Sequence, residues 1–482
     1  MMIPNRKWRM VAFLLLLAVS EESFADNLIG SRPNIVIVMT DDQGYGDLSC
    51  HGHPVLKTPN LDRLSAESLR FTSFFVSPTC APTRAAMLTG RHEFKSGVTH
   101  TINERERLAL SAVTLPAVLK KAGYSTGIFG KWHLGDEDAY QPGQRGFDET
   151  FIHGGGGIGQ TFPGSCGDAP HNRYFDPVLR QNGTFVRTKG YCTDLFFDRA
   201  IAWMGEQSKQ GNQQFFAMIT PNAPHAPLIS PGPMYDRLFR GKTIADKPLS
   251  AEAIRYLAMI ANIDENVGKL LDALESRGIA QKTLVIYLTD NGGTFTQLYS
   301  AGMRGGKGTP YEGGTRVSCF WRWPSRWSAG RDISSLAAHI DLFPTLVELA
   351  GGSMPTPELL DGRSLVPLLH DPNAGWPDRY LFTHVGRWER GQADKAKFRS
   401  CAVRSHQFRF VNNAELYDLS NDPAETTNVI NQYPNEVASM RQAYDRWWIE
   451  ARAGMVNEEA VGPKTNPFHD AYYKQFGVEG KQ

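Results

Sequence analysis

The sequence lacks an excess of charge of either sign: 51 Lys and Arg residues face 50 Asp and Glu residues, a formal net charge of +1. This balance excludes the basic surface typical of nucleic-acid-binding and membrane-surface proteins. Cysteine is also scarce, with 6 in 482 residues, and no Cys-x-x-Cys or His-Glu-x-x-His pattern offers a zinc site. Apolar residues make up 41%, which is enough for a large buried core, and the length fits two or three compact units.

Long hydrophobic runs are missing as well, apart from one near the N-terminus. A basic stretch over residues 5–9 precedes an apolar run over residues 10–19, and residues 23–25 form a small-x-small cleavage site. The run is short for a bilayer span, so the pattern predicts a secretory signal peptide over residues 1–25 rather than a membrane anchor. We therefore expect a secreted or periplasmic protein with no membrane span in its mature chain.

Runs of β-branched residues alternate with helical patterns over most of the chain. The runs 34–40 and 283–289 are typical of strands buried on both faces of a sheet, and residues 251–276 of a long amphipathic helix. The alternation predicts an α/β fold with a large, mostly parallel central sheet flanked by helices. Short stretches nearer the C-terminus predict a smaller α+β subdomain on a short antiparallel sheet. We expect a catalytic domain over 26–381 and this subdomain over 382–482.

Polar side chains follow four of the predicted strands, at the point where each strand ends. Ligands bind at the carboxyl ends of parallel strands, so one shared site explains all four groups, whereas four unrelated solvated loops are the alternative. Adjacent carboxylates at a buried strand end repel each other unless a cation binds, and carboxylate and amide oxygens suit Ca²⁺ or Mg²⁺ better than Zn²⁺. A single acidic pair would favour a helix N-cap or a turn; two such pairs favour a metal site. The groups are Asp41 with Asp42, Lys131 with His133, His225, and Asp290 with Asn291.

The most informative stretch is Cys-Ala-Pro-Thr-Arg at residues 80–84. Pro82 opens a predicted helix that Gly90 closes, so Cys80 lies at the helix N-terminus, where an anion is stabilised. Arg84 follows one turn along and can reach the same point. These features predict a thiolate of low pKa. A disulfide partner or a buried structural cysteine is the alternative.

This stretch resembles the type I sulfatases of the alkaline phosphatase superfamily, in which the Cys of a Cys-x-Pro-x-Arg pattern is oxidised after synthesis to Cα-formylglycine. The fourth position, often Ser in that family, is Thr83 here. The likeness covers most of the chain. The further motifs that carry it are Asp41-Asp42, Leu88-Thr89-Gly90, Gly130-Lys131-Trp132-His133, Pro224-His225, Asp290-Asn291-Gly292, Gly305-Gly306-Lys307-Gly308, Gly313-Gly314-Thr315-Arg316 and Glu415-Leu416-Tyr417-Asp418-Leu419.

The resemblance implies a metal and a modified nucleophile. One divalent cation, usually Ca²⁺ in this family, would bind to four oxygen ligands and to the hydrated aldehyde made from Cys80. One oxygen of that gem-diol would attack sulfur in line with the ester oxygen. The four implied ligands are Asp41, Asp42, Asp290 and Asn291.

The resemblance also implies roles for five further side chains. Arg84 would hold the formylglycine, and Lys131 and Lys307 would bind the sulfate oxygens and stabilise their charge in the transition state. His225 would donate a proton to the leaving oxygen, and His133 would assist removal of the second diol proton, which expels sulfate.

We therefore predict a secreted, calcium-dependent sulfatase (a sulfuric ester hydrolase) that acts on sulfate monoesters, with a sulfated carbohydrate as substrate. A formylglycine-generating enzyme is the expected partner during maturation. A phosphomonoesterase or phosphodiesterase of the same superfamily is the first alternative, which the Cys-x-Pro-x-Arg pattern disfavours. A catalytically silent sulfoglycan-binding protein is the second, in which Cys80 would never be modified.

Two further expectations concern the glycine-rich insertion that starts at residue 154. Cys166 and Cys192 bracket it, so a disulfide between them would close the loop; alternatively, every cysteine other than Cys80 is buried or free. Polar and aromatic side chains in and near the insertion suit the mouth of a sugar-binding pocket and suit ordinary surface loops equally well. They are His153, His171, Arg173, Tyr174, Arg387 and Trp388.

Overall fold

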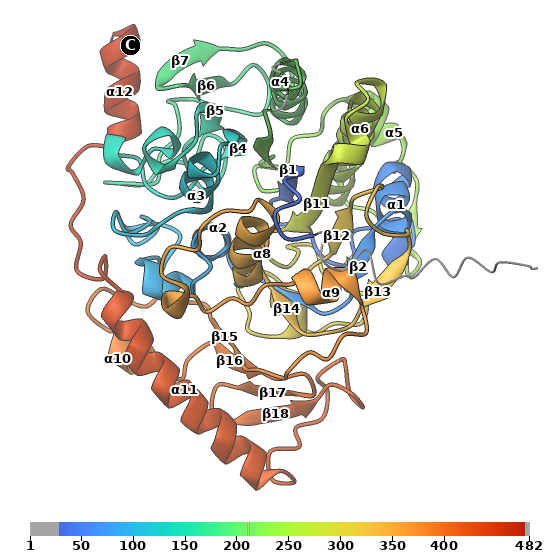
Figure 1. Cartoon of the computed structure of the whole chain (residues 1–482), viewed down its shortest axis with the longest axis vertical. Coiled ribbons are helices and arrows are strands. Elements are labelled where there is room, and N and C mark those ends of the chain that lie inside the picture. The colour runs from blue at the N-terminus through green and yellow to red at the C-terminus, as the bar shows by residue number, and fades with distance from the viewer. Residues whose placement is uncertain (1–27, 210, 212, 478–482) are drawn as a thin grey trace, which may run out of the picture.

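The computed structural model describes residues 28–209, 211 and 213–477 (Figure 1). The predicted signal peptide lies outside these residues. A ten-stranded mixed sheet runs through the larger part of the chain in the order β13-β2-β12-β11-β1-β8-β4-β5-β6-β7. Its centre, from β11 to β5, is parallel, and antiparallel pairs flank it. The predicted α/β class with a mostly parallel central sheet is confirmed.

The strands of this sheet are short and almost entirely buried at its centre. Their bounds are β1 (Asn34–Thr40), β2 (Leu69–Phe71), β4 (Ser125–Lys131), β5 (Glu149–His153), β6 (Val178–Gln181), β7 (Thr184–Arg187), β8 (Phe215–Thr220), β11 (Thr283–Thr289), β12 (Cys319–Arg322) and β13 (Arg331–Ile333). Two small ladders join β3 (Phe74–Phe75) to β14 (Ala337–Ala338) and β9 (Thr243–Ile244) to β10 (Lys247–Pro248).

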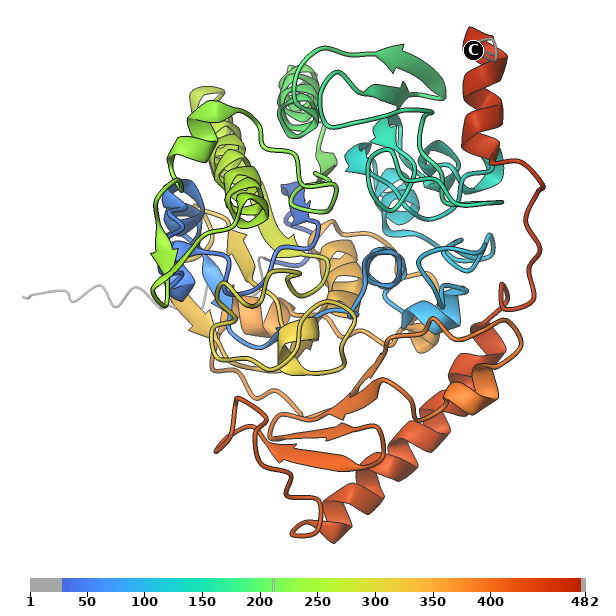
Figure 2. The same ribbon diagram turned by 180° about the vertical axis from the view of Figure 1, so that it is seen from behind.

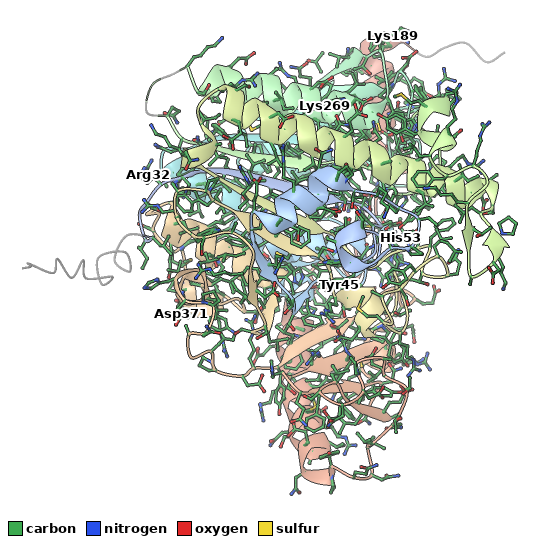
Figure 3. The ribbon with its side chains drawn as sticks, turned by 90° about the vertical axis from the view of Figure 1, so that its right-hand side faces the viewer. Arg32, Tyr45, His53, Lys189, Lys269 and Asp371 are labelled. Atoms are coloured by element: carbon green, nitrogen blue, oxygen red, sulfur yellow. The ribbon has the colours of Figure 1, made fainter. Side chains whose placement is uncertain are left out.

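Helices cover both faces of the sheet, because alternate residues of each central strand point to opposite sides. In β1, Ile35 and Ile37 pack into one hydrophobic core, while Val36 and Val38 pack into the other. On the second face α6 lies across the sheet with Lys269 on its outer side (Figure 3). The first core includes α2 (Cys80–Thr89), α3 (Leu115–Lys121), α8 (Leu342–Leu349) and α9 (Val366–His370), and the second includes α1 (Pro59–Ala66), α4 (Cys192–Gln207) and α6 (Ala251–Ser276). The short α5 (Pro233–Arg237) packs on α6.

A separate four-stranded antiparallel sheet forms near the C-terminus, as predicted. The long helix α11 packs on it through Trp447 and Trp448, which share a core with Val403 and Phe410 (Figure 2). The strands are β15 (Leu381–His384), β16 (Cys401–Arg404), β17 (Phe408–Val411) and β18 (Glu415–Asp418), and the helices are α10 (Ala393–Ala396) and α11 (Pro434–Gly454).

A buried ion cluster attaches this small sheet to the larger part of the chain. Glu312, in the short helix α7 (Glu312–Thr315), accepts hydrogen bonds from Arg404 of β16 at 3.1 Å and Arg409 of β17 at 2.8 Å. Although burial opposes ionisation, Arg409 and then Arg404 lower the pKa of Glu312 to about 2. The cluster therefore fixes the segment just before α7, which carries Lys307.

The last helix leaves the small sheet and returns to the large one. In α12 (Pro467–Phe476) Phe468 packs against Phe185 of β7, and Gln475 accepts a hydrogen bond from the Phe185 backbone at 2.7 Å. By its contacts α12 therefore belongs with the large sheet, whereas the predicted subdomain over 382–482 includes it.

Two buried carboxyl groups hold the glycine-rich insertion in place. Glu106 accepts a hydrogen bond from the Ser165 hydroxyl, and Asp136 accepts one from the Gly167 backbone at 2.6 Å and one from Asn466 at 3.0 Å. The second oxygen of Glu106 has no partner, and burial raises the pKa of Glu106 to about 8.

The raised pKa of Glu106 predicts a loss of stability at alkaline pH. Between pH 4.5 and 8 the unfolded chain releases this proton and the folded chain keeps it, so the free energy of unfolding falls as pH rises. Glu106→Gln keeps the neutral form and is expected to remove a decrease of about 3–4 kcal/mol between pH 5 and pH 8. Urea unfolding at pH 5 and pH 8 measures it, with exposed Glu252→Gln as control. Equal pH slopes for Glu106→Gln and the unsubstituted protein would contradict the assignment.

Candidate active site

The four groups that follow predicted strands meet at one edge of the large sheet. Asp41 and Asp42 follow β1, and Asp290 and Asn291 follow β11, which pairs with β1 in parallel so that Thr40 faces Thr289. The Asp42 backbone donates a hydrogen bond to Asp290 at 3.2 Å, and the Asn291 amide donates one to Asp42 at 3.0 Å. The two acidic pairs therefore form one cluster, as the rule for parallel sheets predicts.

Each carboxylate of the cluster has a cationic partner. Asp290 accepts a hydrogen bond from Arg84 at 2.8 Å; this pair and that of Asp41 with Lys131 are almost completely buried, whereas the Lys307 side chain is 17% exposed. Although burial opposes ionisation, Lys307 holds the pKa of Asp42 below its usual value, and Arg84 does the same for Asp290. The remaining pairs are Asp41 with Lys131 at 2.8 Å and Asp42 with Lys307 at 2.6 Å. Each of the three carboxyl groups therefore contacts one cationic side chain.

The cluster also contains oxygens suited to a metal ion. The second carboxylate oxygen of Asp41 and the amide oxygen of Asn291 are buried without a hydrogen-bond partner. Ligand atoms of Asp41, Cys80 and Asp290 lie within 4.8 Å of one another. Burial, followed by the charge of Asp290, raises the pKa of Asp41 well above its usual value. Carboxylate and amide oxygens in this number fit a hard divalent cation such as Ca²⁺ or Mg²⁺.

Cys80 is the first residue of α2 and is 2% exposed. Burial raises the pKa of its thiol, but Lys131 and Lys307 together outweigh burial, so the pKa lies below the usual value. This agrees with the thiolate predicted at the helix N-terminus. The loop of Lys307 is fixed beside it, because the Gly308 backbone donates a hydrogen bond to Pro78 at 2.8 Å.

Arg84 connects the cluster to β4. One guanidinium nitrogen donates to the backbone oxygen of Lys131 at 3.0 Å, and the other to Asp290. The side chain is 2% exposed, and its positive charge compensates the negative charge of Asp290. Arg84 therefore fixes the position of both Lys131 and Asp290 relative to Cys80.

The hydrogen bonds of the two histidines indicate which ring nitrogen of each carries the proton. Nδ1 of His225 is 2.6 Å from the Ala226 carbonyl and must donate to it, which leaves Nε2 directed towards Asp42 at 3.7 Å. Nε2 of His133 is 2.8 Å from the Thr101 carbonyl, which leaves Nδ1 buried and without a partner. Burial lowers the pKa of both rings, and for His133 the charge of Lys131 adds to it.

The side chains expected at the pocket mouth divide into three kinds. Tyr174 is fully buried, and its hydroxyl donates a hydrogen bond to the His225 carbonyl at 2.7 Å. It therefore holds the backbone of that histidine in place. His153, the last residue of β5, is also buried, whereas Trp388, at 8% exposure, lines a pocket together with Arg387. Tyr174 is buried because its ring packs in the second hydrophobic core. His171, Arg173 and Arg387 are exposed.

The disulfide expected between Cys166 and Cys192 is not formed, and all six cysteines are free. Cys192 begins α4 and packs in the second hydrophobic core, whereas the thiol of Cys166 is close to Glu106 and Asp136. The two side chains therefore occupy different environments. The alternative, that these cysteines stay buried or free, describes the structure.

Sequence reasoning missed Asn222, which lies between β8 and His225. Its amide nitrogen donates to Asp41 at 3.1 Å, and its oxygen accepts the backbone hydrogen of Ile158 at 2.5 Å. The residue therefore joins the carboxylate cluster to the glycine-rich insertion. Its position in the sequence could have indicated this role, because it is a polar side chain two residues after a strand of the same sheet.

The insertion comes close to the reaction centre at its glycines. A Cβ atom on Gly156 would lie 3.0 Å from the His133 ring, and one on Gly157 would lie 2.7 Å from the Gln160 side chain. The consecutive glycines therefore allow the backbone to approach His133.

Sequence profiles of two families match the chain. The Sulfatase family matches residues 33–353, and the family described as N-sulphoglucosamine sulphohydrolase, C-terminal, matches residues 306–446. Human (Homo sapiens) N-acetylgalactosamine-6-sulfatase is 34% identical over 70% of this chain, which spans 66% of that relative's length. Arylsulfatase A of Homo sapiens is 31% identical over 89% of each chain.

Solved structures have the same fold. Ps i-CgsB in complex with k-i-k-neocarrahexaose superposes with a TM-score of 0.76 at 25% identity, over 93% of this chain and 98% of that one. Phosphonate monoester hydrolase of Agrobacterium radiobacter superposes with a TM-score of 0.60 at 22% identity, over 88% of this chain and 96% of that one. The fold alone therefore does not distinguish sulfate from phosphonate chemistry.

Proposed function

Because the chain belongs to the sulfatase family, we propose that it hydrolyses sulfate monoesters on a carbohydrate, with Cys80 as the precursor of the nucleophile. One observation carries this proposal: Cys80 lies at the start of a helix, among three carboxylates and the ammonium groups of Lys131 and Lys307. The names of the relatives support a sulfated sugar as substrate, since one of them acts on N-acetylgalactosamine 6-sulfate.

A cation and a modified residue complete the site in this proposal. Asp41, Asp42, Asp290 and Asn291 hold one Ca²⁺, which supplies positive charge beside the nucleophile when it is bound. Cys80 is converted to formylglycine, whose hydrate supplies one hydroxyl to attack sulfur and a second through which sulfate is released.

The remaining residues bind the sulfate group and move protons. Lys131 and Lys307 bind sulfate oxygens and stabilise the charge that develops on them. His225 acts as the imidazolium and donates its Nε2 proton to the leaving oxygen, while the Nδ1 proton stays hydrogen-bonded to the Ala226 carbonyl. His133 accepts a proton at Nδ1, its unpartnered nitrogen. Arg84 keeps Lys131 and Asp290 in position beside the nucleophile.

Maturation in this proposal precedes folding. All ten residues of α2 are buried, including Cys80 and Pro82. A formylglycine-generating enzyme therefore reaches Cys80 only in an unfolded chain, which fits secretion through the N-terminal signal peptide.

In the part of the chain that the structure describes, no helix is long and apolar enough to cross a membrane.

Matched aryl esters test the proposed function. We expect the secreted protein, produced in a host that makes formylglycine, to hydrolyse an aryl sulfate at least about 100 times faster than the same aryl phosphate. Peptide mass analysis at Cys80 accompanies the assay and should show the aldehyde. Preference for the phosphate would indicate the phosphatase alternative. An unmodified thiol together with tight sulfoglycan binding and no turnover would indicate the silent binding protein.

A further inference from the structure

A pocket of about 370 Å³ lies between the end of β15 and α10. Three of the side chains that line it are cationic: Arg387, Lys395 and Arg399. All three residues are exposed. The volume is within the range of small-ligand sites.

The charges of this pocket are not neutralised by the surrounding protein. Among the described residues, none of the three cations takes part in an ion pair, and Glu389 is the one acidic residue in the lining, so the formal charge is 3 − 1 = +2. The nearby Asp394 is paired with Arg452 at 3.0 Å. Burial lowers the pKa of the lining residue His384 to about 4, so it is neutral.

Another pocket provides a contrast. A pocket of about 510 Å³ beside β5 and β6 also contains two cations. There, Lys120 pairs with Asp148 at 2.5 Å and Arg180 with Asp138 at 3.3 Å. In the described part of the chain, unpaired cations also line a third pocket of about 400 Å³, through Arg32, Lys282 and Arg326, so what distinguishes the pocket beside α10 is the contact of Arg387 with Thr101.

One residue links the cationic pocket to the reaction centre. Arg387 donates a hydrogen bond from its guanidinium to the Thr101 hydroxyl at 3.2 Å, and the Thr101 carbonyl contacts His133 at 2.8 Å. Arg387 also has φ of +63°, a left-handed conformation that costs a non-glycine residue about 1–2 kcal/mol. Its backbone hydrogen bond to Thr99 at 3.1 Å and the Thr101 contact hold the side chain in this position.

We propose that this pocket binds a second anionic group of the glycan whose sulfate ester reaches Cys80. The inference rests on the proposed function and specifies it: the substrate is an oligosaccharide with at least two anionic groups, not an isolated monosulfated sugar. Arg387 contacts the sugar next to the reacting one, and Lys395 and Arg399 bind the second sulfate or carboxylate by charge-assisted hydrogen bonds.

Binding and kinetics of a double variant, which leaves the contact of Arg387 with Thr101 intact, test this inference. In Lys395→Gln/Arg399→Gln we expect kcat/KM for an aryl sulfate to stay within about twofold, because that substrate has no second anion. For a sulfated tetrasaccharide we expect KM to rise at least about tenfold with kcat little changed. A carrageenan tetrasaccharide, whose anions are sulfates, and a chondroitin 6-sulfate tetrasaccharide, which adds carboxylates, distinguish the two sources of the second charge.

A second double variant controls for the loss of two positive charges. Lys121 and Lys209 are exposed and precede β4 and β8, at the opposite edge of the sheet. Replacing these two lysines by Gln should leave both KM values unchanged. An unchanged tetrasaccharide KM in the pocket variant, or an equal rise in the control, would overturn the inference.

Calorimetry separates this inference from the proposed function. Both tetrasaccharides are titrated into Cys80→Ala protein with and without the pocket substitutions. If the protein hydrolyses no sulfate ester, the proposed function fails, and weaker tetrasaccharide binding by the pocket variant still supports the anion site. If neither tetrasaccharide binds, or if binding is insensitive to the pocket substitutions, the anion site is wrong even where aryl sulfate is hydrolysed.

Discussion

Replacement of Cys80 by Ala is expected to reduce sulfate-ester hydrolysis at least about 10⁴-fold and to leave the fold intact. The substitution removes the one side chain from which the proposed nucleophile is made, while Lys131, Lys307 and the carboxylates stay in place. Only a sulfur atom is lost, at a site formed mainly by polar groups, so we expect Tm to change by no more than a few degrees.

Initial rates on an aryl sulfate, together with thermal unfolding, measure both parts of this prediction. Cys80→Ser should be nearly as inactive, unless the host oxidises Ser as well. Cys50→Ala is the matched control, because Cys50 is an exposed free cysteine outside the group of possible metal ligands, and it should keep full activity. Retention of normal activity by Cys80→Ala would rule out the proposed mechanism.

The sequence predicted those parts of the site that follow from strand order. Asp41, Asp42, Asp290 and Asn291 each follow a buried β-branched run directly, and parallel strands end at a common edge. Their proximity therefore needs no knowledge of loop structure. The place of Cys80 at a helix N-terminus could also be predicted from the sequence, because Pro82 and Gly90 delimit that helix.

Contacts made by loops could not be predicted in this way. Thr101 contacts both His133 and Arg387, residues that are widely separated along the chain and are brought together only by tertiary packing. Tyr174 is polar at one end and aromatic at the other, and no local pattern indicates that it is buried beneath His225. The absence of a bond between Cys166 and Cys192 has the same origin, because spacing alone does not fix the direction of either side chain.

Two lysines pair with the adjacent carboxylates of this site. The adjacent carboxylates of Asp41 and Asp42 were expected to repel each other strongly, but Lys131 and Lys307 each neutralise one of them. What a bound cation adds is a partner for two buried oxygens, on Asp41 and Asn291. Leaving such a group without a partner costs about 1–3 kcal/mol, so metal binding should stabilise the fold moderately.

Chelation by EDTA is therefore expected to abolish activity and to lower Tm by about 5 °C, without unfolding the protein at room temperature. Ca²⁺ added in excess should restore both quantities, and Zn²⁺ should not, because the ligands are hard oxygens. Differential scanning calorimetry with and without EDTA measures the shift in Tm, and aryl sulfate hydrolysis measures the activity.

Two variants show whether the shift in Tm arises at the carboxylate cluster. In Asp42→Asn the ligand set is incomplete, so activity should fall at least about 10³-fold and EDTA should no longer change Tm. Asp272→Asn removes an exposed carboxylate that pairs with Arg63 on the surface, and it should keep both the activity and the full response to EDTA. The assignment would be wrong if the unsubstituted protein melted at the same temperature with and without chelator. It would also be wrong if Asp42→Asn kept the response, because the cation would then bind elsewhere on the chain.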